Sequence, residues 1–178
     1  MSNQSQPQDT VLPPIVEDLF LTEAFLIKGR IAHKYQRLNK MLESTERAFI
    51  TIEDATMVAL RGTQVIRTPR VQINRDEIIF AHELFNTASD ETLRRWGDDE
   101  KPIRIRAFYS GGVQIELAGQ IEPGAYEPAH NAGRDYFVMK SPSIRGLPTQ
   151  ENEELKVLES LEYCIVRKSK LAYIYDFS

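Results

Sequence analysis

The chain has little cysteine, little histidine and no long hydrophobic run. Its single cysteine, Cys164, has no partner for an internal disulfide, and the apolar stretch "LEYCIV" around it predicts a buried, reduced thiol rather than a catalytic nucleophile. The histidines His33, His82 and His130 form no His-x-His or His-Glu-x-x-His pattern, so we expect no metal site and no cofactor. Apolar runs fall short of the roughly 18 residues of a membrane helix.

An excess of positive charge is also missing. The formal net charge is -4, and residues 1–88 carry 10 basic and 11 acidic side chains against 12 and 15 in residues 89–178. Neither half therefore supplies the positive field that non-specific binding to nucleic acid or anionic membranes needs. The N-terminal "MSNQSQPQDTVLPP" has no basic or apolar region of a signal peptide, so we expect a soluble, cytoplasmic protein that does not bind membranes.

Two polar segments divide the chain. Residues 1–13 are rich in Gln, Ser, Asn and Pro and predict a flexible tail. Residues 86–102, "NTASDETLRRWGDDEKP", interrupt a strand-like pattern and predict a linker. The sequence therefore predicts one domain over 14–85 and another over 103–178.

The two predicted domains resemble each other in three blocks. Residues 19–31 align with residues 109–121 at an offset of 90, which places Gly29 on Gly119 and keeps the alternation of apolar and polar residues in phase. "FITIEDATM" then aligns with "FVMKSPSIR" at an offset of 88, and "VQINRDEII" with "YCIVRKSKL" at 92. This order favours a duplication over chance similarity of short strands, and the shared glycine predicts a bulge or bend.

The connections within each half indicate the fold. Leu38, Met41 and Leu42 have helical spacing and predict a short helix that closes one mouth of a barrel. The corresponding "EPGAYEPAHNAGRD" contains two prolines and two glycines and predicts a loop. We therefore expect an all-β protein with a minor helix, built as two tandem, duplicated small barrels of SH3 or Sm type packed together.

Short motifs in residues 20–85 resemble an uncharacterised family of small bacterial β-rich domains. They are Arg37-Leu38 before the short helix, Asp54-Ala55 after the strand that begins at Phe49, and "NRD" at 74–76 before a final strand. The resemblance implies an SH3-like or Sm-like fold and no assigned activity. The second half departs from the pattern, since Pro142 and Ser143 replace the Asp-Ala pair.

The polar triplet Asn74, Arg75 and Asp76 is a candidate binding site, but a turn explains it more simply. It separates "VQI" from "IIF", where we expect a hairpin turn, and Asn and Asp are favourable turn residues. Arg75 aligns with Arg167, which favours a structural role for it, such as an ion pair with Asp54 or another acid.

A basic patch is the second candidate. Arg61, Arg67, Arg70 and Arg75 lie in a stretch, residues 55–75, that contains no acidic residue. Such a surface suits an RNA- or nucleotide-binding regulator. Because no aromatic residues are interleaved with these arginines, we favour a solvated or partner-facing surface. His82 and Glu83 we interpret as a surface pair rather than an acid/base couple.

The C-terminal "AYIYDF" would expose apolar side chains on both faces of a strand, namely those of Tyr173, Ile174, Tyr175 and Phe177. Such a strand requires cover on both sides. No convergent cluster of titratable residues indicates catalysis. The sequence therefore favours a non-enzymatic binding or assembly module that acts through protein partners or self-association, with the RNA- or nucleotide-binding regulator as the alternative.

Overall fold

The computed structural model describes residues 17–34, 36–44, 46–84, 101–127 and 133–177. The predicted tail at 1–13 and nearly all of the predicted linker at 86–102 lie outside these residues. Most of the described chain is β-sheet, with one short α-helix and three 3-10 turns. The elements in chain order are β1 (Asp18–Leu21), β2 (Phe25–Ile31), α1 (Leu38–Glu43), β3 (Phe49–Ala59), β4 (Val65–Asn74), η1 (Arg75–Glu77), β5 (Phe80–Glu83), β6 (Ile103–Ser110), β7 (Gln114–Ile121), β8 (Tyr136–Arg145), η2 (Glu153–Glu159), β9 (Tyr163–Arg167), η3 (Lys168–Lys170) and β10 (Tyr173–Asp176).

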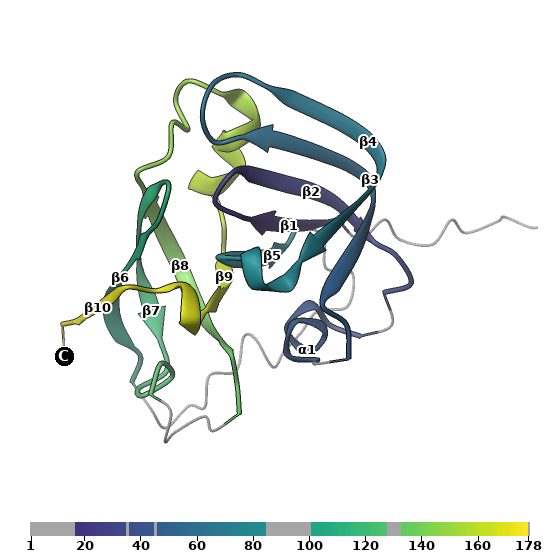
Figure 1. Ribbon diagram of the computed structural model, residues 1–178. Coiled ribbons are helices and arrows are strands. Elements are labelled where there is room, and N and C mark those ends of the chain that lie inside the picture. The colour runs from purple at the N-terminus through teal and green to yellow at the C-terminus, as the bar shows by residue number, and fades with distance from the viewer. Residues whose placement is uncertain (1–16, 35, 45, 85–100, 128–132, 178) are drawn as a thin grey trace, which may run out of the picture.

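All ten strands belong to one antiparallel sheet in the order β10-β6-β7-β8-β9-β5-β1-β2-β3-β4. The strands of the two halves do not interleave, and the halves meet where β5 pairs with β9 (Figure 1). Adding five to each strand number converts the order of the first half, β5-β1-β2-β3-β4, into that of the second. The described strands form an open sheet that ends at β4 and β10. The expected pair of closed barrels is therefore not confirmed.

The alternation of apolar and polar residues in the sequence matches the alternation of buried and exposed side chains along the strands. In β7, Ile115, Leu117 and Ile121 are buried, whereas Gln114 and Gln120 are exposed. A strand places successive side chains on opposite faces, so one face of β7 lies in the core and the other lies in solvent. The even spacing of the apolar residues therefore identifies this strand correctly.

The shared glycines lie at irregularities in the ladder, as predicted. The pairing of β2 with β3 shifts between Lys28 and Arg30, and the pairing of β7 with β8 shifts across Gly119. A Cβ atom on Gly29 would lie 2.6 Å from the side chain of Ile52, and one on Gly119 would lie 2.5 Å from that of Met139. Each bend therefore needs a residue without a side chain.

The predicted hairpin at Asn74–Glu77 is wrong. Residues 75–77 form the 3-10 turn η1, and β4 and β5 are not neighbours in the sheet. Instead β5 pairs with β1 on one side and β9 on the other, while β4 pairs with β3. A 3-10 turn redirects the chain across the fold, whereas a two-residue hairpin turn would have folded β5 back onto β4.

Two hydrophobic clusters hold the sheet, and the predicted helix packs on one of them. Leu38 and Leu42 of α1 lie fully buried beside Phe20, Ile52 and residues of β4 and β5. The second cluster combines residues of both halves, including Leu19 and Leu21 of β1 with Leu155 and Leu158 of η2. The central strand β1 is therefore covered on both faces. No helix among the described residues has the length and apolar character to cross a bilayer.

The extra length of the second half reaches back to the first. Glu154 of η2 forms an ion pair with Lys28 of β2 and lies 3.9 Å from Arg67 of β4. The segment that carries η2 accordingly lies beside the β3–β4 hairpin (Figure 1). The connection therefore helps to fix one half against the other.

Candidate protein-binding edge

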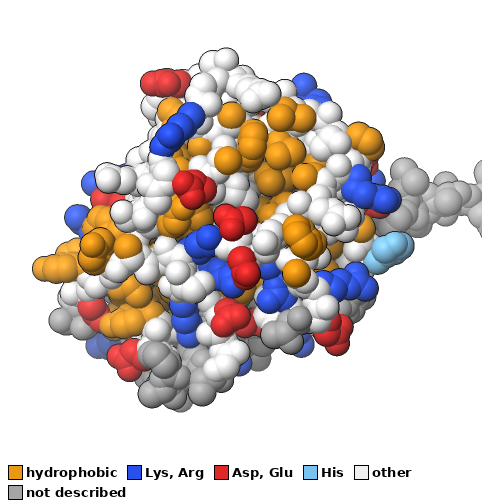
Figure 2. Space-filling model, in the orientation of Figure 1, with side chains coloured by type: hydrophobic (Ala, Val, Ile, Leu, Met, Phe, Trp, Pro, Cys, Tyr) orange, Lys and Arg blue, Asp and Glu red, His pale blue; other side chains and the backbone are white. Residues whose placement is uncertain are grey.

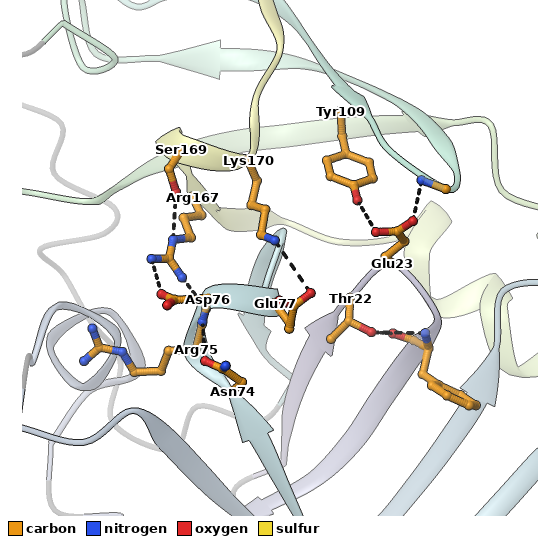
Figure 3. A network of polar contacts seen from close by, with 12 residues as sticks. Thr22, Glu23, Asn74, Arg75, Asp76, Glu77, Tyr109, Arg167, Ser169 and Lys170 are labelled. Atoms are coloured by element: carbon orange, nitrogen blue, oxygen red, sulfur yellow. Dashed lines mark hydrogen bonds and ion pairs between the residues drawn. The ribbon is translucent and has the colours of Figure 1, made fainter.

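The triplet at residues 74–76 lies where the two halves meet. The side-chain oxygen of Asn74 accepts a hydrogen bond from the backbone N–H of Asp76 at 3.0 Å, which caps η1. The carboxylate of Asp76 accepts a hydrogen bond from Arg167 at 2.6 Å (Figure 3). This hydrogen bond, together with the positive charge of Arg167, lowers the pKa of Asp76. The triplet therefore has a structural task at this contact.

The opposite side of the contact is the turn η3. Arg167, only 11% exposed in its side chain, donates to the backbone carbonyl of Arg75 and to the hydroxyl of Ser169. Lys170 lies 3.7 Å from Glu77. Figure 2 shows acidic and basic side chains close together at the centre of the face that it draws. The two 3-10 turns thus carry opposite charges toward each other, which supports their contact.

A second polar contact joins the halves and was not foreseen from the sequence. Glu23, in the β1–β2 turn, accepts hydrogen bonds from the hydroxyl of Tyr109 at 2.9 Å and from the backbone N–H of Gly112 (Figure 3). A glutamate in a turn gives no sequence signal of a partner 86 residues away. Only the packing of the halves identifies it.

The four arginines of the predicted basic patch do not converge. Arg61 is exposed in the β3–β4 turn, and Arg67 and Arg70 lie three residues apart on β4, so the pleat sends them to opposite faces. Arg67 lies near Glu154, and Arg70 lies 3.4 Å from Glu53. Arg75 belongs to η1, and Figure 3 shows its side chain directed away from the Asp76–Arg167 contact. An RNA- or nucleotide-binding surface formed by these arginines therefore stays a prediction.

The structure differs from two expectations about polar residues. Asp54 pairs with Arg30, its neighbour across the β2–β3 bulge, and not with Arg75. His82 and Glu83 are buried rather than on the surface, because β5 is an inner strand of the sheet. The ring of His82 contacts the ring of Tyr163 at a centroid distance of 4.5 Å with an interplanar angle of 59°, and burial lowers the pKa of His82.

Glu83 belongs instead to a buried cluster of charges. Lys34 lies 2.7 Å from both the Asp18 and the Glu83 carboxylates, and Glu83 also accepts a hydrogen bond from the backbone N–H of Leu38. Burial raises the pKa of Asp18 to about 6, although Lys34 opposes this rise. Because Glu83 also anchors the first turn of α1, this cluster fixes the helix to the sheet. Its charged side chains form ion pairs with one another and thereby stabilise the fold.

Cys164 is buried, as predicted, and burial raises the pKa of its thiol. Within the described ranges, no three His, Cys, Asp or Glu side chains are grouped so that they could hold a metal ion.

Three of the four large hydrophobic side chains that are exposed in the described residues lie at β10 and just after it. Tyr173, Tyr175 and Phe177 are 70%, 60% and 49% exposed, and they alternate along one face of the strand. Figure 2 shows hydrophobic side chains on the surface at the end of the molecule where β10 lies. The rings of Tyr175 and Phe177 lie 4.9 Å apart, and the guanidinium of Arg106 lies 5.4 Å from the centre of the Phe177 ring.

β10 is also an end of the sheet. It pairs with β6 on one side, and among the described strands nothing pairs with its other side. The strand contains no proline and one charge, Asp176, whose carboxylate accepts a hydrogen bond from Tyr126 at 3.0 Å. A hollow of about 380 Å³ adjoins Tyr173 and is lined by residues of β6, β7 and β8, among them Phe108 and Arg145. An unprotected edge beside a hollow suits the addition of a strand from another chain.

Comparisons with protein-family models, with curated proteins and with solved structures gave no match to this chain.

Proposed function

We propose that this chain is a non-enzymatic assembly module that binds a strand of a partner protein at the open edge of β10. The observation that carries the proposal is the exposure of Tyr173, Tyr175 and Phe177 on an edge strand that pairs on one side only among the described strands. Natural proteins protect such edges with charge, proline or a covering segment, because an exposed edge is a template for pairing. An edge that is both apolar and unprotected is a docking surface.

The edge supplies both affinity and selectivity. The backbone N–H and C=O groups on the outer side of β10 offer hydrogen bonds to an added strand, and the three aromatic rings offer apolar area. Aromatic residues next to an arginine, here Arg106, are the composition of interface hot spots.

The proposal includes the architecture expected from the sequence. Each half is a copy of one five-stranded unit, related to small SH3-like or Sm-like barrels. Three features support the duplication: the same strand order in both halves, a glycine bulge in the second strand of each, and a 3-10 turn before each last strand. The duplication matters for function because it leaves one outermost strand from each copy.

Photo-crosslinking tests the proposal. A benzoylphenylalanine in place of Tyr175 is expected to capture another polypeptide in living cells, because that side chain would lie at the interface. The same probe at Ser143, which is exposed on β8 away from the edge, is the control. Absence of a protein adduct at position 175, or capture of nucleic acid in its place, would overturn the proposal.

A further inference from the structure

The internal junction, which is the pairing of β5 with β9, joins strands that hold different positions in their two halves. β5 is the last strand of the first half, and β9 is the fourth strand of the second half. They pair through Phe80 opposite Val166 and Ala81 opposite Ile165, and the N–H of Arg167 donates to the carbonyl of Ile79 at 3.0 Å. The two strands left at the ends of the sheet are β4, the fourth of the first half, and β10, the last of the second. The open edges are thus the counterparts of the two strands already joined.

A residue-by-residue correspondence follows from the structure. Asn74 and Arg167 each precede a 3-10 turn, and Phe80 and Tyr173 each begin the last strand, which gives the same spacing of 93 residues. Matching hydrogen bonds support it, because Ile79 donates to Leu21 at 2.8 Å and Ala172 donates to Phe108 at 2.8 Å. The structural spacing is one residue longer than the 92 that the sequence blocks gave.

The large hydrophobic residues that the structure exposes are the counterparts of residues buried at the internal junction. Tyr173 corresponds to Phe80, which is fully buried against β9, and Tyr175 corresponds to His82, whose ring contacts that of Tyr163. Phe177 falls at the position of Leu84, which is partly buried.

The same holds on the other side of the junction. Phe49, 51% exposed, begins β3 as the 5% exposed Tyr136 begins β8. The side chain of Tyr136 packs in the hydrophobic cluster formed mostly by the first half, and its backbone N–H donates to Glu43 of that half at 3.0 Å. The described surface therefore exposes both sides of an interface of which the molecule already contains one example.

We infer that a second copy of this chain places its β4 against β10, repeating between molecules the β5–β9 junction within each. The inference rests on the proposed function and names its partner. Phe80 pairs with Val166 inside the chain, and their counterparts at a spacing of 93 residues are Tyr173 and Ile73. The repeated junction therefore sets Tyr173 opposite Ile73 of the second copy. It also sets Tyr175 beside Arg70 of the second copy, as His82 lies beside Tyr163, and contact between an arginine and an aromatic ring is attractive.

The outer side of β4 has the hydrogen-bonding groups that this pairing requires. The N–H of Arg75 donates to the carbonyl of Ala48, which is continuous with β3. Because N–H groups alternate in direction along a strand, those of Gln72 and Asn74 point away from β3. They correspond to Ile165 and Arg167, whose N–H groups face β5.

The repeated junction has a direction. Each chain offers β10 to one neighbour and β4 to the next, so the contact is heterologous and produces a ring or a filament rather than a two-fold dimer. This property separates the inference from a symmetric pairing of β10 with β10.

Two blocked variants test it in sedimentation with the purified chain. Tyr173→Glu/Tyr175→Glu blocks β10, and Gln72→Pro blocks β4 by removing an outward N–H. We expect the wild type to assemble and each blocked variant alone to sediment as one chain of 20.4 kDa. An equimolar mixture of the two variants is expected to form a dimer of twice that mass and nothing larger, because one intact edge of each kind remains.

Matched controls keep this test sharp. Gln120→Glu/Ser143→Glu places two charges at exposed positions on β7 and β8. Thr68→Pro introduces a proline into β4 at a residue that has no counterpart in β9. Both control variants are expected to assemble as the wild type does. Phe49→Asp/Arg70→Glu is a second β4-side variant, with two exposed side chains, for use if the proline variant does not fold.

Three outcomes would overturn the inference. They are a wild type that stays a single chain at millimolar concentration, a Gln72→Pro variant that dimerises alone through paired β10 strands, and a mixture that fails to combine although both variants are folded. If the wild type stays a single chain while the probe at Tyr175 captures a different protein in cells, the inference fails and the proposed function stands. If that probe captures no protein either, both fail.

Discussion

Arg167 and Asp76 lie 2.6 Å apart across the contact between the two halves, although 91 residues separate them in the chain. The arginine is nearly buried and the aspartate is mostly exposed, so the contact depends more on the surroundings of Arg167 than on the ion pair itself. It holds η1 beside the end of β9, next to the pairing of β5 with β9. The polar triplet at residues 74–76 therefore has a structural role, because Asn74 caps η1 and Asp76 binds Arg167.

Replacing Arg167 with methionine is expected to lower the free energy of unfolding by about 2 kcal/mol, because hydrogen bonds to a charged donor are lost at a nearly buried position. Urea denaturation measures the change. Asp76→Asn is expected to cost less, since that carboxylate is exposed. A loss no larger than that of Arg104→Met, at an exposed position of β6, would contradict the importance of this contact.

Lys34→Met is expected to destabilise the protein by about 3–5 kcal/mol, because two buried carboxylates would lose their shared counter-ion. Thermal and urea unfolding both report this change. The triple variant Asp18→Asn/Lys34→Met/Glu83→Gln is expected to recover part of the loss. Lys40→Met, at an exposed position on α1, is the control and is expected to change stability little.

The buried Asp18 is expected to make stability fall as the pH rises from about 4 to about 6. Its pKa is about 6 in the folded protein against 3.8 for an unperturbed aspartate, so the folded state binds the proton more tightly than the unfolded chain does. The favourable contribution is complete below about pH 4 and is lost as the pH passes the folded pKa, a change of about 3 kcal/mol.

The comparison of wild type with Asp18→Asn isolates this effect. Protonation of His82, whose pKa burial lowers, acts in the opposite direction, since stability from neutral His82 is lost as the pH falls. Because His82 is common to both proteins, its effect cancels in the difference. A difference in unfolding free energy that does not change between about pH 4 and about pH 7 would show that Asp18 does not titrate as described.

Gly29→Ala is expected to destabilise the protein by about 1–3 kcal/mol, since the new Cβ would lie 2.7 Å from the backbone oxygen of Glu53 as well as 2.6 Å from Ile52. Gly119→Ala is expected to behave alike, because its Cβ would lie 2.8 Å from the backbone oxygen of Lys140. Thermal unfolding measures both. If either alanine is tolerated without loss, the bend at that bulge does not require glycine.

Local residue patterns explain why part of this fold could be predicted. The spacing of apolar residues located β7 and the helix at Leu38, and the aligned glycines located the bulges at Gly29 and Gly119, because each feature depends on residues close in the chain. The burial of Cys164 followed from its apolar neighbours in the same way. The aromatic residues of the last strand also marked a surface that needs cover.

The candidate site required information that periodicity does not contain. The same apolar pattern is compatible with β5 as a hairpin partner of β4 or as an inner strand between β1 and β9. That choice decided whether His82 and Glu83 are exposed or buried, and which aromatic side chains remain uncovered.

By itself the sequence determined local elements such as β7, the helix at Leu38 and the bends at Gly29 and Gly119, since side-chain alternation and glycine bends are properties of neighbouring residues. Only the tertiary structure decided that β5 joins β9 and leaves β4 and β10 at the ends of the sheet. The physical reason is that strand pairing is a contact between distant backbones. Its partner is selected by the packing of both halves, through residues such as Arg167, Glu23 and Glu154.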